Sequence, residues 1–216
     1  MIYSKKSKGG PMSKNQSLQN QMLKRVLMVG ALAATMLMSG CASMYVDTAT
    51  RDIQPGDIKP VAQPQPVQLK FEFQTKGAPN ATATAYLKDQ VAEQVKKSGL
   101  FSSIDGPAGG ALLNIVLNNI PLTDNPEGKG FVTGLTFGLA GSVVTDGYVC
   151  KLTYLPAGDA QPVNKEVRHA IHATIGNANP PENAIPSKDG DEAVRTMTRQ
   201  IVDNALKDLS HDPNFK

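Results

Sequence analysis

Residues with reactive side chains are few in this chain of 216 residues, which has two cysteines and three histidines. Cys150 and His169 could in principle act as a nucleophile and its base, but both fall among apolar neighbours on expected strands, where a buried thiol is inert. His169 and His172 are three residues apart, so on a strand they point to opposite faces and do not share a metal ion. The sequence therefore predicts no catalysis, no metal centre and no cofactor.

The stretch before Cys41 has the order of a secretory signal peptide. Lys24 and Arg25 precede an apolar run at 26–38, and two small residues follow that run. The run is too short for a membrane-spanning helix, which needs about 20 residues. We therefore expect residues 1–40 to be a leader that directs the chain to export.

The residues Met38-Ser39-Gly40-Cys41 resemble the lipobox of bacterial lipoproteins, whose pattern is an aliphatic residue, a small residue, Gly or Ala, then Cys. The resemblance implies cleavage before Cys41, a diacylglycerol on its sulfur, and acylation of the new amine, for example with palmitate. Two or more acyl chains suffice for stable attachment, because each buried CH₂ contributes about 0.8 kcal/mol. Ala42, which is not Asp, favours the outer membrane by the same resemblance. The alternative is an ordinary secreted protein in which Cys41 is a bystander.

The leader region accounts for the basic balance of the chain. The whole sequence has 22 Lys plus Arg and 19 Asp plus Glu, and all the charged residues before Cys41 are bases. A chain processed at Cys41 would therefore be acidic overall. Nucleic-acid binding calls for a clustered basic face, so we expect no nucleic-acid partner. A leader of this kind would begin more typically at Met22 or Met12 than at Met1.

Residues 41–66 are expected to be the lipidated Cys and a tether, because they are rich in Pro and polar residues and show no apolar period. Pro-rich linkers extend by about 3.1 Å per residue, so this one would hold the domain up to roughly 75 Å from the bilayer. Residues 67–216 are expected to form a single periplasmic domain.

Hydrophobic periodicity predicts four strands and two helices in that domain. Asn80 can cap the N-terminus of the first helix, and Asp189 or Asp191 can cap that of the second. The order β-α-β-β-β-α predicts an α+β fold with a four-stranded, mostly antiparallel or mixed sheet and two amphipathic helices on one face. This order resembles that of small envelope-assembly lipoproteins. The expected strands are 67–75, 111–120, 147–155 and 163–175, and the expected helices are 81–97 and 189–209.

An apolar, Gly-rich segment at 130–145 carries no charge. Gly130, Gly134 and Gly138 recur every four residues, which on a helix would align them on one face for close approach in lipid. We expect this segment to contact a partner protein or the membrane. The alternative is an apolar loop that packs on its own domain. The candidate contact residues are its large side chains, Phe131, Leu135, Phe137 and Leu139.

These features predict a non-enzymatic lipoprotein that is anchored at the outer membrane, faces the periplasm, and binds or scaffolds another component of the cell envelope. It would contact the membrane through the lipid on Cys41 and an envelope protein through 130–145. Two alternatives stay open. One is an oligomeric, pore-forming or secretion-associated lipoprotein that inserts 130–145, and the other is an enzyme with an unrecognised site around Cys150 and His169.

Overall fold

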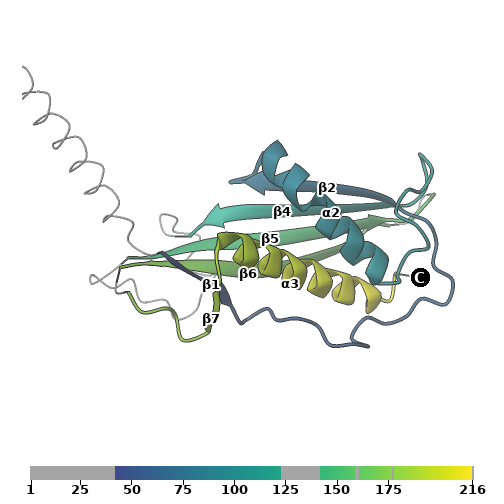
Figure 1. Ribbon diagram of the computed structural model, residues 1–216. Helices are drawn as coiled ribbons and strands as arrows, with labels where there is room; N and C mark the ends of the chain where they lie inside the picture. Colours follow the sequence, from purple (N-terminus) through teal and green to yellow (C-terminus); the bar gives the residue numbers. More distant parts are fainter. Residues whose placement is uncertain (1–41, 123–141, 159–160, 177, 216) are drawn as a thin grey trace, which may run out of the picture. The chain divides into compact units, whose positions relative to one another are not determined.

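The computed structural model describes residues 42–122, 142–158, 161–176 and 178–215. These residues form a mixed α+β fold in which two helices lie on one face of a seven-stranded sheet (Figure 1). The strand order is β3-β2-β4-β5-β6-β1-β7. The strands are β1 (Ser43–Asp47), β2 (Gln68–Thr75), β3 (Ala78–Pro79), β4 (Leu112–Pro121), β5 (Ser142–Leu155), β6 (Val163–Ile175) and β7 (Ala184–Ser187), and the helices are α2 (Ala81–Lys97) and α3 (Gly190–Ser210).

The strand pairing follows from the connections. β2 and β4 are parallel, and α2 is the crossover between them, as parallel neighbours require. β4, β5 and β6 are antiparallel neighbours. The alternating residues of β4 that face the helices are fully buried, which confirms the period-two pattern. They are Leu113, Ile115 and Leu117.

The helices begin and end where their local signals predict. The Asn80 side chain accepts a hydrogen bond from the backbone N–H of Ala83, and the Asp189 side chain accepts one from Glu192. Gly99 follows α2 with a φ of +68°, a conformation that Gly adopts without strain. In the part of the chain that the structure describes, no helix is long and apolar enough to cross a membrane.

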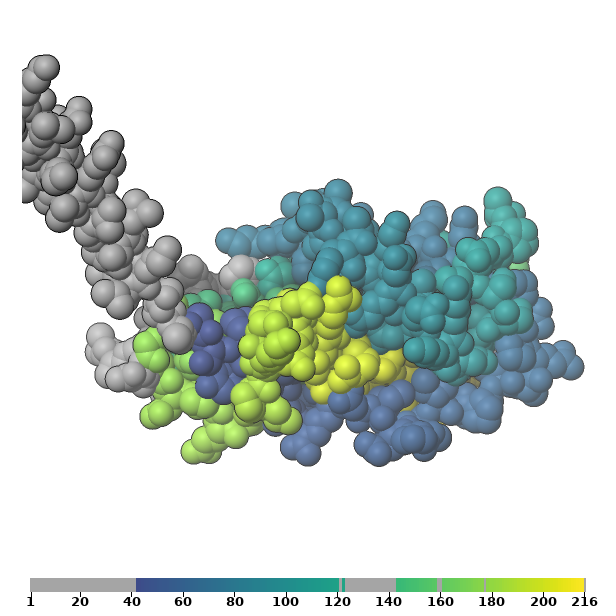
Figure 2. Space-filling model, viewed as in Figure 1, coloured from purple at the N-terminus to yellow at the C-terminus, as the bar shows by residue number. Residues whose placement is uncertain are grey.

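The two helices form one layer. α2 packs on β2, and α3 packs on β6, β1 and β5. The helices lie side by side in the space-filling view, in teal and yellow (Figure 2). Gln94 of α2 links them, since its amide donates to the carbonyl oxygen of Arg199 at 3.0 Å and to the Asp203 carboxylate at 2.8 Å. The buried core lies between this layer and the sheet.

The expectation of four strands was too low. β1, β3 and β7 were missed, and β1 falls inside the segment that was expected to be a tether. β1 lies between β6 and β7 and pairs with both in antiparallel register. It is only five residues long and turns two apolar side chains, Met44 and Val46, toward the core. Such a short pattern gives no clear period in the sequence.

Residues 48–66 are also more than a spacer. The segment runs along α3 (Figure 2, blue beside yellow), where the Asp52 carboxylate pairs with Arg199 at 2.8 Å. The backbone N–H of Lys59 donates to the Ser210 hydroxyl at 3.0 Å. Ile58 and Val61 pack against the core. The reach of roughly 75 Å required that none of the segment be ordered. Polar and apolar contacts hold residues 48–66 on the domain, so that condition is not met.

β5 begins earlier than expected, at Ser142. Its first four residues pair with the end of β6, from Ser142 opposite Ile175 to Thr145 opposite His172. The last residues of the segment 130–145 therefore belong to the sheet, where Thr145 is buried. This corrects the expectation that the whole segment is a contact surface.

Candidate functional site

The residues to which the sequence assigned lipidation and partner contact are Cys41 and the four large apolar side chains of 130–145. Ala42 is the first described residue, so Cys41 lies just outside the described part of the chain. The apolar contact residues also lie outside the described residues, and they are Phe131, Leu135, Phe137 and Leu139.

Cys150 and His169 lie on the helix-facing side of neighbouring strands, but each is held in the core. Cys150 is fully buried, and burial raises the pKa of its thiol to about 12. The Nδ1 atom of His169 accepts from the backbone N–H of Ala170 at 2.9 Å, so Nε2 carries the proton and donates to the Gln200 side chain at 2.7 Å. Burial lowers the pKa of His169, which favours this neutral ring. These contacts give both side chains a structural role.

The prediction that His169 and His172 face opposite sides of the sheet is confirmed. His169 contacts Gln200 of α3, whereas His172 contacts Thr145 and Asp47. Among the described residues, no group of three or more His, Cys, Asp and Glu side chains is placed to hold a metal ion.

The structure brings together a polar cluster that the sequence analysis did not find: the buried Thr145, His172 and Asp47, with the exposed Asn183 at its edge. The Asp47 carboxylate lies 3.4 Å from His172 Nε2 and accepts from the Asn183 amide at 2.9 Å. The Thr145 hydroxyl lies 2.9 Å from His172 Nδ1. With the proton on Nε2 facing Asp47, Nδ1 accepts from that hydroxyl. The four residues come from β5, β6, β1 and the loop before β7, so the cluster joins β1 to the sheet.

The charge of Asp47 is favoured inside this cluster. Burial by itself raises the pKa of the Asp47 carboxyl group, but the hydrogen bonds from His172 and from the backbone N–H of Ala49 lower it. The net pKa lies below the ordinary value of 3.8. Asp47 is therefore ionised at neutral pH and holds its hydrogen-bond donors in place.

A hydroxyl, an imidazole and a carboxylate in series are also the parts of a nucleophilic triad. Here the hydroxyl is only 2% exposed and the imidazole is fully buried, so neither presents a surface to a substrate. The arrangement can therefore hold strands together and specify the register of β1, rather than attack a bound molecule. A buried polar network of this kind stabilises a fold when its members are satisfied.

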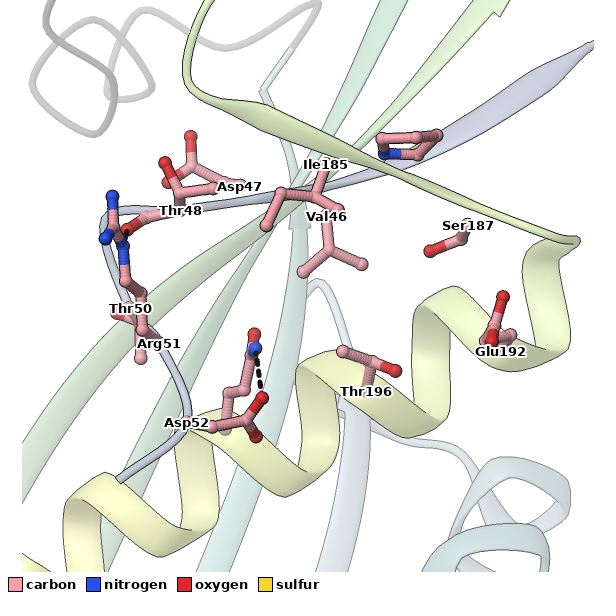
Figure 3. Close-up of a pocket in the computed structure, with 12 residues that line it drawn as sticks. Val46, Asp47, Thr48, Thr50, Arg51, Asp52, Ile185, Ser187, Glu192 and Thr196 are labelled. Carbon is pink, nitrogen blue, oxygen red and sulfur yellow. Dashed lines mark hydrogen bonds between the residues drawn. The ribbon is translucent and has the colours of Figure 1, made fainter. Parts of the chain in front are cut away.

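A cavity of about 230 Å³ lies between β1 and the residues that follow it, β7 and the first half of α3, and Asp47 is among the residues that line it (Figure 3). Val46 and Ile185 form its apolar wall, and Glu192 and Thr196 line it from the helix. Asp52 also lines it, but its carboxylate accepts from Gln200 at 3.2 Å and pairs with Arg199 (Figure 3). The cavity is smaller than the 300–1,000 Å³ or so of ordinary ligand sites.

Sequence reasoning missed the Asp47 cluster because its contacts are distant in the chain. Asp47 and His172 are separated by 125 residues, and Asp47 and Asn183 by 136. The one local signal is that Asp47 follows the alternation of Met44 and Val46, which marks it as the end of a short strand. Nothing in the sequence pairs that strand with β6.

The fold and the cluster define a mixed α+β domain whose first residues are built into its sheet. No protein-family model matches the sequence, and no curated protein matches it. Solved structures do resemble it in part. A neuraminyllactose-binding hemagglutinin homologue from Helicobacter pylori is 12% identical, with a TM-score of 0.38, and the match covers 74% of this chain and 89% of that one.

Two further solved structures are similar at comparable levels. Rare lipoprotein B from Shewanella oneidensis is 17% identical, with a TM-score of 0.36 over 68% of this chain and 94% of that one. The PelC dodecamer from Paraburkholderia phytofirmans is 11% identical, with a TM-score of 0.32 over 80% of this chain and 99% of that one. The solved structures that resemble this chain thus include bacterial lipoproteins. These levels of similarity assign no function to this chain.

Proposed function

We propose that this protein is a non-enzymatic lipoprotein of the outer membrane. A lipid on Cys41 anchors it, its domain faces the periplasm, and it binds or scaffolds another component of the cell envelope. The observation that carries the proposal is the position of β1. The lipobox-like Met38-Ser39-Gly40-Cys41 is followed at once by a strand at Ser43–Asp47, with one residue between Cys41 and the sheet.

An anchor joined in this way supports a scaffolding role. β1 is paired on both sides, with β6 and β7, and its last residue enters the Asp47 cluster. A lipid on Cys41 would therefore be attached to the sheet itself rather than to a free linker. Such an attachment holds the domain at a fixed distance from the bilayer, and a fixed distance suits a protein that positions a partner.

Replacing Cys41 with Ser tests the anchor. We expect Cys41→Ser to lose palmitate labelling and membrane association, because two or more acyl chains provide the stable attachment in this proposal. The measurements are incorporation of labelled palmitate and fractionation of cell envelopes. The matched control is Cys150→Ala, which removes the other thiol and should keep both labelling and membrane association. Normal labelling of Cys41→Ser would overturn the proposal.

The apolar side chains of 131–139 are proposed as the contact with the envelope partner. We expect the double substitution of Phe131 and Phe137 with Ser to abolish crosslinking to that partner in intact cells, because it removes large apolar contact area. The control is Leu155→Ser, since Leu155 is 39% exposed on the described sheet. Equal crosslinking by both variants would exclude this contact. A deletion meant to spare the fold should not extend past residue 141, because Ser142 begins β5.

A further inference from the structure

Three strand ends meet at one end of the sheet. Ser43, at the start of β1, pairs with Thr174 near the end of β6. The next residue of β6, Ile175, pairs with Ser142 at the start of β5. This end lies away from the C-terminus of the chain (Figure 1). The first residues of β1 are therefore part of this end of the sheet. We call it the anchor end.

The strand residues at the tip of the anchor end carry no charge. The residues 42–46, 142–145 and 173–176 include no Asp, Glu, Lys or Arg, and the first charged residues along β1 and β5 are Asp47 and Asp146.

The anchor end also exposes apolar surface. Ile175 is 48% exposed, and Val143 and Val144 of the neighbouring strand are half-buried. The nearest charged residues in the helix layer, Lys188 and Asp189, follow β7, whose Ser187 pairs with Met44. Continuing that register places Lys188 level with Ser43, and Asp189 level with Ala42 and therefore with Ile175 on the far side of β1.

Chain connectivity brings a lipid to this end. Two peptide units separate Cys41 from Ser43, and an extended chain spans at most about 7 Å over that length. If acyl chains on Cys41 enter the bilayer, Ser43 cannot leave its surface, and β1 cannot detach without breaking its pairing with β6 and β7. The apolar side chain of Ile175, one residue beyond the partner of Ser43, then lies close to the same surface.

We propose that the anchor end is a lipid-contacting surface, with the sheet standing on the bilayer through Ile175 and its neighbours on β5 and β1. This inference rests on the proposed lipidation of Cys41. Its occupant is a lipid surface, because a partly apolar strand tip adjoins the attachment point. The opposite end, with Leu155, then faces away from the membrane, because β5 has 14 residues and 13 residue steps span about 44 Å.

The chain contains no Trp, so a single introduced Trp reports its own surroundings. Ile175→Trp and Leu155→Trp are matched variants, because both are aliphatic residues at strand ends and are 48% and 39% exposed. The full, lipidated chain of each is reconstituted in phosphatidylcholine vesicles with or without brominated acyl chains. Ile175→Trp should lose most of its emission to bromine, and Leu155→Trp should lose none.

The outcomes separate the two proposals. If wild-type protein purified from membranes fails to float with the vesicles, the anchor proposal fails. If it floats and Leu155→Trp is quenched as much as Ile175→Trp, or if neither is quenched, the orientation is wrong while the anchor stands. Should Ile175→Trp not fold, as judged by circular dichroism, Ser43→Trp reports on the same end at an exposed position. Quenching of Ser43→Trp without quenching of Leu155→Trp supports the proposal.

Discussion

Val46→Asp should greatly lower the free energy of unfolding of the domain. Val46 is 4% exposed and lies between Ile171 of β6 and Ile185 of β7 in the paired strands. A carboxylate at this position would be buried in the core without a partner, and the loss of stability should be at least about 4 kcal/mol. Native domains are stable by only about 5–15 kcal/mol, so a loss of this size is a large part of the total. Urea unfolding followed by circular dichroism measures the change.

The matched control is Ser43→Asp. It places the same charge on the same strand at an exposed position, and surface substitutions change stability by only about 0.5 kcal/mol or less. If β1 were part of a free tether, the two variants would be equally stable. Equal unfolding midpoints for Val46→Asp and Ser43→Asp would therefore contradict the pairing of β1 with the sheet.

Asp47→Ala should be the second most damaging of these changes. The Asp47 carboxylate accepts hydrogen bonds from Ala49, from Asn183 and, at 3.4 Å, from His172, and it is 5% exposed. Truncation leaves the fully buried His172 without this acceptor, whereas Ala49 and Asn183 are exposed and can bond to water. An unsatisfied buried group costs about 1–3 kcal/mol, so we expect a loss of about that size in the free energy of unfolding at neutral pH, measured by urea titration.

The effect of Asp47→Ala should shrink in acid. The pKa of Asp47 is depressed below 3.8 in the folded protein. A carboxyl group of this kind contributes stability above its unfolded pKa, and the contribution is lost as the pH falls through the folded pKa. Protonation of Asp47 should therefore lower the stability of the wild type as the pH falls below about 4. Asp47→Ala has no carboxyl group at this position and should not show this loss. A constant difference between the two proteins from pH 7 to about 2 would contradict this linkage.

Asp52→Ala is the control for both measurements. Asp52 lies five residues further on and pairs with Arg199, but its side chain is 49% exposed. An exposed ion pair contributes only about 1 kcal/mol or less. If Asp47→Ala and Asp52→Ala lowered the free energy of unfolding by similar amounts, the buried contacts of Asp47 would contribute no more to stability than the exposed ion pair of Asp52.

The sequence by itself determined the elements whose apolar residues repeat over many positions. α2 and α3 occupy the expected ranges to within a residue or two. β4 is shifted by one residue and β6 has the expected bounds, because long periodic patterns report burial on one side. Asn80 acts as the helix cap that its side chain predicted. These features depend on neighbours within a few positions, and such neighbours are visible in one dimension.

Only the tertiary structure decided how the chain around β1 is used. β1 and β7 are five and four residues long, so each gains its place from pairing with strands far along the chain. The contact between Asp47 and His172 spans 125 positions, and no local pattern encodes it. Backbone groups of a short strand must find partners once they are buried, and here β6 and β7 supply them. That pairing joins the chain to the sheet from Ser43 onward, two residues after Cys41, where the sequence had predicted a linker.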